Sequence, residues 1–195
     1  DDLYVEFRTR DGVAKAINGV SYTLDAGETL AVLGESGSGK SVTAQTIMGI
    51  LDMPPGFITG GEIRYKGRDL LQMPEKERQK IRGAEIAMIF QDSLSALNPV
   101  FTVGDQISEM FQVHRGMSKK EGMKRAVDLM EQVRIPGAKD RVKDYPHQFS
   151  GGMRQRIMIA MAISLDPAVL IADEPTTALD VTVQAQIMEL LQELQ

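Results

Sequence analysis

Residues Thr29–Ser41 read TLAVLGESGSGKS, an apolar segment that runs into a glycine-rich turn and then into a polar helix start. The spacing G-x-x-x-x-G-K-[ST] is that of a phosphate-binding loop. We therefore predict an apolar strand over Thr29–Leu33 and a helix over Lys40–Met48. The alternative is a strand-to-helix turn that binds nothing, and it is disfavoured because both flanking elements required by the motif are predicted.

The residue types in this loop suit the phosphates of a nucleoside triphosphate. Glycines let backbone N–H groups approach phosphate oxygens, and the dipole of the following helix favours an anion. The Lys40 ammonium can reach the β and γ phosphates, and the Ser41 hydroxyl can ligate Mg²⁺. The predicted nucleotide contacts are Gly34, Glu35, Ser36, Gly37, Ser38, Gly39, Lys40, Ser41 and Val42.

A second strand, predicted to be buried and to span Ala168–Ala172, ends at the acidic pair Asp173-Glu174. Asp173 suits the coordination shell of a Mg²⁺ ion, and Glu174 suits the base that deprotonates a water attacking the γ phosphorus. The alternative is an acidic pair that only caps a strand. The complete phosphate loop earlier in the chain favours the catalytic interpretation.

Gln91 follows another short apolar strand, predicted over Ile86–Phe90. Its amide suits contact with Mg²⁺ or a bound water and could sense what docks on the following helices. The alternative is a surface glutamine in a turn.

Ser150-Gly151-Gly152 opens a helix predicted over Met153–Ser164 and resembles a second anion cradle. Either both cradles serve one phosphate within the chain, or the second serves a nucleotide held by another subunit. The alternative is a helix N-cap whose glycines allow close packing.

The rest of the pattern predicts an α/β fold with an antiparallel β region and a helical insertion. Buried apolar strands are typical of a mostly parallel sheet, and alternating segments are typical of antiparallel strands. The antiparallel strands are predicted over Leu3–Arg8, Val20–Leu24 and Glu62–Tyr65, and capped helices over Val103–His114 and Lys119–Val133. We expect one domain over 1–195, with a catalytic core over 1–91 and 156–195 and a helical subdomain over 92–155.

Composition disfavours several classes of protein. The formal charge of −5 gives no general reason to bind nucleic acid, and His114 and His147 lack metal-spaced partners. The run Ile157–Leu165 is too short to cross a bilayer, so membrane association would require a partner. The chain starts without Met and stops at Gln195 inside a helical pattern, so we expect a fragment truncated at its C-terminus.

Five ordered segments carry a resemblance to the ATPase subunits of ATP-binding cassette (ABC) transporters, most of all to the branch that powers peptide and nickel importers. The segments are GESGSGKS (34–41), FQDSLSALNP (90–99), FSGGMRQR (149–156), LIADEPTTALD (170–180) and VTVQAQIMELL (181–191). The resemblance implies a RecA-like P-loop core, ATP and Mg²⁺ as ligands, and ATP hydrolysis. It implies catalytic roles for Lys40, Gln91 and Glu174, and metal contacts from Ser41, Gln91 and Asp173.

The same resemblance implies a head-to-tail pair of ATPase subunits with ATP between the P-loop of one and Ser150, Gly151 and Gly152 of the other. Asp180 would lie in the loop that crosses this dimer. Two membrane permeases and, indirectly, a solute-binding protein are the implied partners, at the cytoplasmic face of the plasma membrane. The cargo is not indicated.

Three departures from the family pattern stand out. Phe149 and Met153 replace the ends of the commoner LSGGQ signature, and no aromatic residue lies near Arg10–Val13 to stack on adenine, which leaves Val13 as an apolar candidate. The switch histidine expected some thirty residues beyond Glu174 is not in the chain. A DNA-acting ATPase of this architecture would carry coiled-coil heptads in place of the insertion, and a non-catalytic regulator would lack Lys40 or Glu174.

Overall fold

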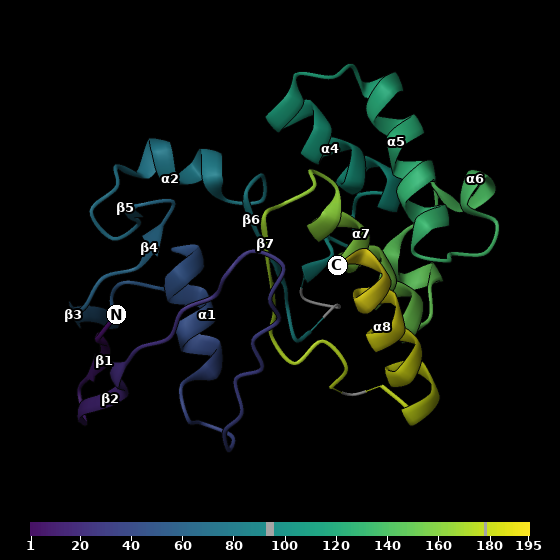
Figure 1. Cartoon of the computed structure of the whole chain (residues 1–195). Coiled ribbons are helices and arrows are strands. Elements are labelled where there is room, and N and C mark those ends of the chain that lie inside the picture. The colour runs from purple at the N-terminus through teal and green to yellow at the C-terminus, as the bar shows by residue number, and fades with distance from the viewer. Residues whose placement is uncertain (93–95, 178) are drawn as a thin grey trace. The chain divides into compact units, whose positions relative to one another are not determined.

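The structure, a computed structural model, describes residues 1–92, 96–177 and 179–195. Ser93–Ser95, which belong to the FQDSLSALNP segment, and Ala178 lie outside the described residues. The chain forms two compact units, Asp1–Gln79 and Lys80–Gln195. The elements of each unit are labelled in Figure 1.

The first unit is built on an antiparallel sheet with strand order β2-β1-β3 (Figure 1), as the alternating pattern at the N-terminus predicts. The strands are β1 (Leu3–Thr9), β2 (Gly12–Val20) and β3 (Gly56–Gly60). Leu3 and Val5 share one face of β1 and are buried with Ile17 of β2. The sheet therefore has a small core on one face.

The first unit also contains helix α1 (Lys40–Met48), a hairpin of β4 (Arg64–Tyr65) and β5 (Arg68–Asp69), and all but the last two residues of α2 (Glu75–Ile81). The predicted bounds of α1 are confirmed, because Gly39 and Gly49 adopt left-handed conformations at its two ends. At the C-terminus of α1, Arg78 of α2 donates to the carbonyl oxygens of Thr46 at 2.8 Å and Ile47 at 3.3 Å. A cation at this end also complements the helix dipole.

Two predicted strands of this unit are wrong. Residues 21–24 do not continue β2, because Val20 pairs with Leu3, the first residue of β1, and the ladder ends there. Thr29–Leu33 forms no strand among the described residues, and Leu33 is 91% exposed. A buried strand of this kind needs parallel neighbours, and the described parallel pair belongs to the second unit.

The second unit contains that pair, β6 (Ile86–Ile89) and β7 (Val169–Ala172), together with most of the helices. All four residues of β6 are buried, which confirms the interpretation of this segment as a buried strand. The same prediction for β7 is wrong: its first three residues are half-buried and Ala172 is exposed, because β6 is the one partner strand described for it. The helices are α4 (Val103–Arg115), α5 (Lys119–Gln132), α6 (Ala138–Arg141), α7 (Gly151–Ile163) and α8 (Val181–Leu194), with a 3₁₀ turn at Pro146–Gln148. Residues of β6 and of these five helices share one hydrophobic core. The boundary between a catalytic core and a helical subdomain stays a prediction.

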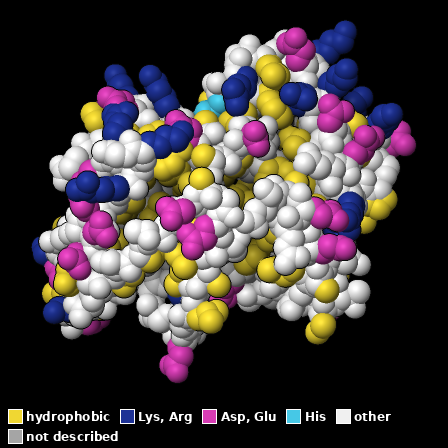
Figure 2. Space-filling model, viewed as in Figure 1, with side chains coloured by type: hydrophobic (Ala, Val, Ile, Leu, Met, Phe, Trp, Pro, Cys, Tyr) yellow, Lys and Arg dark blue, Asp and Glu magenta, His cyan; other side chains and the backbone are white. Residues whose placement is uncertain are grey.

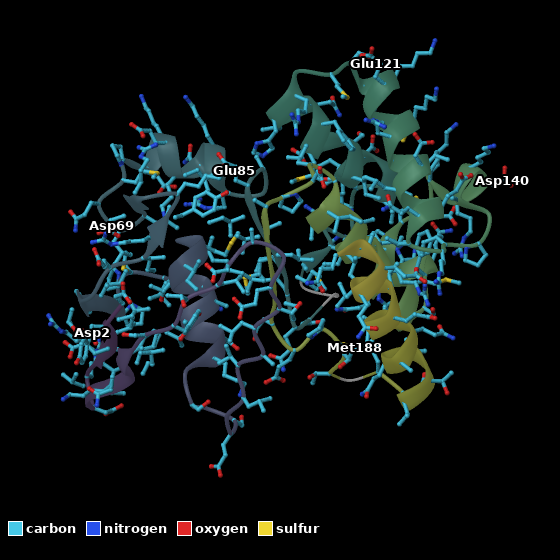
Figure 3. The ribbon with its side chains drawn as sticks, in the orientation of Figure 1. Asp2, Asp69, Glu85, Glu121, Asp140 and Met188 are labelled. Carbon is cyan, nitrogen blue, oxygen red and sulfur yellow. The ribbon has the colours of Figure 1, made fainter. Side chains whose placement is uncertain are left out.

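Both predicted caps of the insertion are confirmed. The Thr102 hydroxyl accepts from the backbone N–H of Asp105, and Ser118 and Glu121 form a reciprocal capping box at the start of α5. Glu121 is labelled in Figure 3 at the beginning of this helix. Lys119 of α5 pairs with Asp105 of α4 at 2.9 Å. Hydrogen bonds from Lys119 and then Thr102 hold the pKa of Asp105 below its ordinary value.

Charged side chains of both signs are interspersed on the visible face of each unit (Figure 2). Within the described residues, no helix combines the length and the apolar character needed to cross a lipid bilayer.

Candidate functional site

The phosphate loop takes its shape from glycines at two positions. Gly37 and Gly39 have φ angles of +81° and +93°, in the left-handed region that favours glycine. A Cβ at Gly39 would lie 2.4 Å from the carbonyl oxygen of Ala16 in β2, whereas a Cβ at Gly37 would meet nothing within 4 Å. Gly39 is thus fixed by its own conformation and by a neighbouring backbone, while Gly37 leaves open space where a ligand could approach.

Lys40 folds back over this loop at the first residue of α1. Its Nζ donates to the carbonyl oxygens of Gly34 at 2.8 Å and Glu35 at 3.0 Å. No acidic side chain lies in the first turn of α1, a helix that the structure describes in full. The helix N-terminus and the ammonium are therefore both suited to an anion.

The acidic pair follows β7 in the second unit. The N–H of Asp173 donates to the carbonyl of Ile89 at 3.0 Å, which extends the β6–β7 ladder by one bond, and the Asp173 side chain is buried. Because Gln91 and Glu174 come after the C-terminal ends of neighbouring parallel strands, their side chains meet.

The carboxylate of Glu174 accepts two hydrogen bonds on the same oxygen. The Nε2 of Gln91 and the Oγ1 of Thr177 each donate to Oε2 of Glu174 at 3.0 Å. Glu174 has a φ of +46°, which non-glycine residues seldom adopt. Its backbone strain and its two donors fix where this carboxylate points.

The serine-glycine segment is a helix N-terminus, as predicted. The Ser150 hydroxyl accepts from the N–H of Met153 at 3.4 Å and caps α7. A Cβ at Gly152 would lie 2.8 Å from Cγ1 of Val183 in α8, whereas a Cβ at Gly151 would meet only the far end of a side chain at 4.0 Å. Close packing explains Gly152, and it leaves Gly151 without a steric reason.

Arg141 of α6 holds the segment before this N-terminus, and the sequence interpretation missed it. Its guanidinium lies 4.2 Å from the centroid of the Phe149 ring and donates to the carbonyl of Gln148 at 2.9 Å. Asp144 accepts from Nε of the same guanidinium at 3.1 Å. An arginine nine residues before a capping serine has no distinctive sequence signal, because the contact depends on the turn between them.

Asp180 is the N-cap of α8, where its carboxylate accepts from the N–H of Val183 at 3.0 Å. The structure therefore gives this side chain a local role besides any contact across a dimer. One turn into α8, the amide of Gln184 donates to the carbonyls of Thr176 and Leu179, a contact that the sequence interpretation also missed.

The predicted metal contacts are a hydroxyl (Ser41), an amide (Gln91) and a carboxylate (Asp173), all with oxygen atoms of the kind that Mg²⁺ prefers. Ser41 belongs to the first unit, and Gln91 and Asp173 belong to the second. The described residues contain no group of three or more His, Cys, Asp and Glu side chains that could hold an ion. The predicted set has one carboxylate, and the phosphates of the nucleotide would supply further oxygen ligands. A magnesium site of this kind does not require a cluster of three acidic or histidine side chains.

Comparisons with known proteins bear on the family and the fold of this chain. The profile described as "ABC transporter" matches residues 17–177. The chain is 57% identical to the oligopeptide transport ATP-binding protein OppD of Bacillus subtilis over 194 residues, which are 100% of this chain and 54% of that protein. It is 57% identical to the dipeptide transport ATP-binding protein DppD of Lactococcus lactis, over 100% of this chain and 56% of that protein. The chain thus spans about half the length of the curated relatives it matches.

Among solved structures, the ATP-binding cassette MJ0796 in a dimeric post-hydrolysis state bound to ADP and Pi superposes with a TM-score of 0.86 at 28% identity. The match covers 100% of this chain and 81% of that one. It confirms the predicted fold class, an α/β P-loop cassette.

Proposed function

Because this chain belongs to the ABC transporter family, we propose that it is the ATP-binding and ATP-hydrolysing part of a subunit that energises a peptide importer. The observation that carries the hydrolytic role is the Glu174 carboxylate, held by Gln91 and Thr177 immediately after the buried Asp173. The assignment to peptide import is supported by the 57% identity to OppD and DppD along the whole chain.

The triphosphate of ATP would bind Gly34, Glu35, Ser36, Gly37, Ser38, Gly39, Lys40, Ser41 and Val42. Backbone N–H groups at the start of α1 would donate to phosphate oxygens, as expected for a helix N-terminus. The Lys40 ammonium, which donates to two loop carbonyls in this structure, would exchange them for β and γ phosphate oxygens. A charge-assisted bond to phosphate is stronger than a bond to a neutral carbonyl, so this exchange is favourable.

In the hydrolytic step, Glu174 would accept a proton from water while the water oxygen bonds to the γ phosphorus. The bond between that phosphorus and the bridging oxygen breaks, which gives ADP and inorganic phosphate. Ser41, Asp173 and Gln91 are the residues that would hold Mg²⁺, which would supply positive charge to offset the charge of the phosphates. Since Nε2 of Gln91 donates to Glu174, Oε1 is the atom that suits the metal.

The remaining assignments concern partners. We infer a head-to-tail dimer in which Ser150, Gly151 and Gly152 of one subunit contact the ATP of the other, with Asp180 at the crossing. The absence of a steric reason for glycine at 151 supports this role. Two permease subunits and, indirectly, a solute-binding protein complete the importer at the cytoplasmic face of the plasma membrane.

The test uses the full-length protein with ATP and Mg²⁺. Lys40→Ala should weaken nucleotide binding at least tenfold, because it removes the charge opposite the phosphates. Glu174→Gln should keep ATP bound while slowing single-turnover hydrolysis by about 10²–10³. Wild-type turnover in Glu174→Gln would overturn the assignment of the base, and undiminished ATP affinity in Lys40→Ala would overturn the assignment of the phosphate site.

A further inference from the structure

The described residues that follow β7 and Asp173, Glu174–Thr177 and Leu179–Asp180, are held together by hydrogen bonds within the segment and from α8. For brevity, the acidic turn denotes Glu174–Thr177 together with Leu179–Asp180. Its backbone is closed by two hydrogen bonds, from the N–H of Thr177 to the carbonyl of Glu174 at 3.1 Å and from the N–H of Leu179 to the carbonyl of Thr176 at 3.2 Å. Glu174 occupies the left-handed region, which a non-glycine residue keeps only when its surroundings hold it there.

Gln184 of α8 supplies such a hold from outside the turn. Its Nε2 donates to the carbonyl oxygen of Thr176 at 3.2 Å and to that of Leu179 at 3.0 Å. Both amide hydrogens are used, so one side chain ties two points of the acidic turn to the first turn of α8. That helix start is fixed in its own right by the Asp180 cap.

The amide of Gln184 is connected to Glu174 through Thr177. Thr177 comes directly after one of the clamped carbonyls, and its hydroxyl donates to Oε2 of Glu174 at 3.0 Å. The same oxygen accepts from Gln91 on the other side. A shift in the clamped backbone would therefore move one of the two donors that orient the carboxylate.

We propose that Gln184 is a positioning residue for ATP hydrolysis: its amide clamps the acidic turn so that Thr177 holds the Glu174 carboxylate in the orientation that receives the proton from water. The inference rests on the proposed function and adds to it a residue that touches neither nucleotide nor metal. It requires a side chain that donates two hydrogen bonds at this length, and neither glutamate nor methionine, which are close to glutamine in shape, donates any.

The test compares Gln184→Met with Gln192→Met in the full-length protein. Gln192 is an exposed glutamine on the same helix, so the pair controls for the loss of an amide from α8. We expect Gln184→Met to lower kcat for ATP about tenfold while KM stays within about twofold, since small displacements of a catalytic group reduce the chemical step. Gln192→Met should match wild type.

Adding Gln184→Met to the Glu174→Gln variant distinguishes a positioning role from a general loss of structure. In Glu174→Gln, single-turnover hydrolysis should be slow and Gln184→Met should slow it no further, because the carboxylate that it orients is already gone. Thr177→Val, at an exposed site whose loss should not prevent folding, should lower kcat by a similar factor and should not add to Gln184→Met.

Three outcomes would overturn the inference. The first is an unchanged kcat in Gln184→Met. The second is that Gln184→Met lowers the rate of ATP hydrolysis by the same factor in the wild-type protein and in Glu174→Gln. The third is full additivity with Thr177→Val. If Glu174→Gln itself hydrolyses ATP like wild type, the assignment of Glu174 as the base fails and the positioning role fails with it. If only Gln184→Met resembles wild type, the assignment of the base and the proposed function stand.

Discussion

At Gly39, two independent constraints act on one residue. Its φ of +93° would strain any side chain, and the carbonyl oxygen of Ala16 occupies the place of a Cβ. Gly37 carries the first constraint without the second. The phosphate loop therefore contains one glycine required by neighbouring backbone and one required by its own conformation.

Alanine at these two positions should separate the constraints. Gly37→Ala should cost about 1 kcal/mol of unfolding free energy, equivalent to about 2–4 °C in Tm. Gly39→Ala should cost about 3 kcal/mol or more, because the Cβ contact forces α1 and β2 apart. Thermal denaturation monitored by circular dichroism measures both, and equal losses would show that the Ala16 contact is unimportant.

At the scale of elements, α7 and α8 approach closely where Gly152 meets Val183. Gly151→Ala should leave Tm within about 2 °C of wild type, whereas Gly152→Ala should lower it by about 4–8 °C, as expected for overpacking that costs roughly 2 kcal/mol. Val183→Ala should restore part of that loss by vacating the space. A Gly152→Ala protein as stable as wild type, or one that Val183→Ala fails to rescue, would contradict the packing role.

The stability of the helix pair α4–α5 should depend on pH through Asp105. Hydrogen bonds from Lys119 and Thr102 lower the pKa of this carboxyl in the folded state from 3.8, so the folded state binds fewer protons than the unfolded state. The stabilisation is then fully present above pH 3.8 and is lost as the pH falls through the lowered pKa. Asp105→Asn should flatten the fall of Tm between about pH 4 and pH 2.5. A curve parallel to that of wild type would rule out this contribution.

The helices and strands also show which parts of the fold can be predicted from the sequence. The sequence predicts the observed bounds of helix α1 because Gly39 marks its start and Gly49 marks its end. The caps at Thr102 and Ser118 are also signals within a few residues of the helices that they start. The strand expected at Thr29–Leu33 was wrong because strand formation depends on partners far away in the chain, which apolar character alone does not supply.

The same distinction applies to the site. The sequence predicts both Gln91 and Glu174, since each follows an apolar segment with the character of a strand, and the structure joins them by a hydrogen bond. Thr177 and Gln184 lie in two of the segments that carry the resemblance, but their contacts were missed because they depend on the backbone path of the turn, which residue types alone do not give. Arg141 was missed for the same reason: its partners include a carbonyl oxygen and an aromatic face, which any sequence can offer.

At the scale of the whole molecule, the two units have unequal cores. Among the described residues, the buried hydrophobic side chains of the first unit are Leu3, Val5, Ile17, Ala44, Met48 and Leu70, whereas the second unit has a larger buried set drawn from β6 and five helices. Each fully buried aliphatic side chain contributes about 1.5–3 kcal/mol, so the second unit has a much larger driving force for staying folded.

Native-state hydrogen exchange should reveal this difference. Amides of β1–β3 should exchange through openings whose free energy is lower by about 2 kcal/mol or more than those of β6 and α7. Mass spectrometry of peptides from each unit, across low concentrations of guanidinium, gives both values in one experiment. Identical protection of the two sets would indicate that the units open together.

Because Glu174 has a left-handed backbone conformation, the residues that best stabilise this position differ from the residue that we propose for catalysis. Glycine at this position relieves the strain, and asparagine tolerates it better than glutamate does, so either change removes about 1 kcal/mol of conformational cost. A library selected only for heat resistance should therefore enrich both replacements, and each removes the carboxylate that we propose as the catalytic base. Directed evolution of this cassette needs a growth-coupled selection, because thermal stability and activity favour different amino acids at position 174.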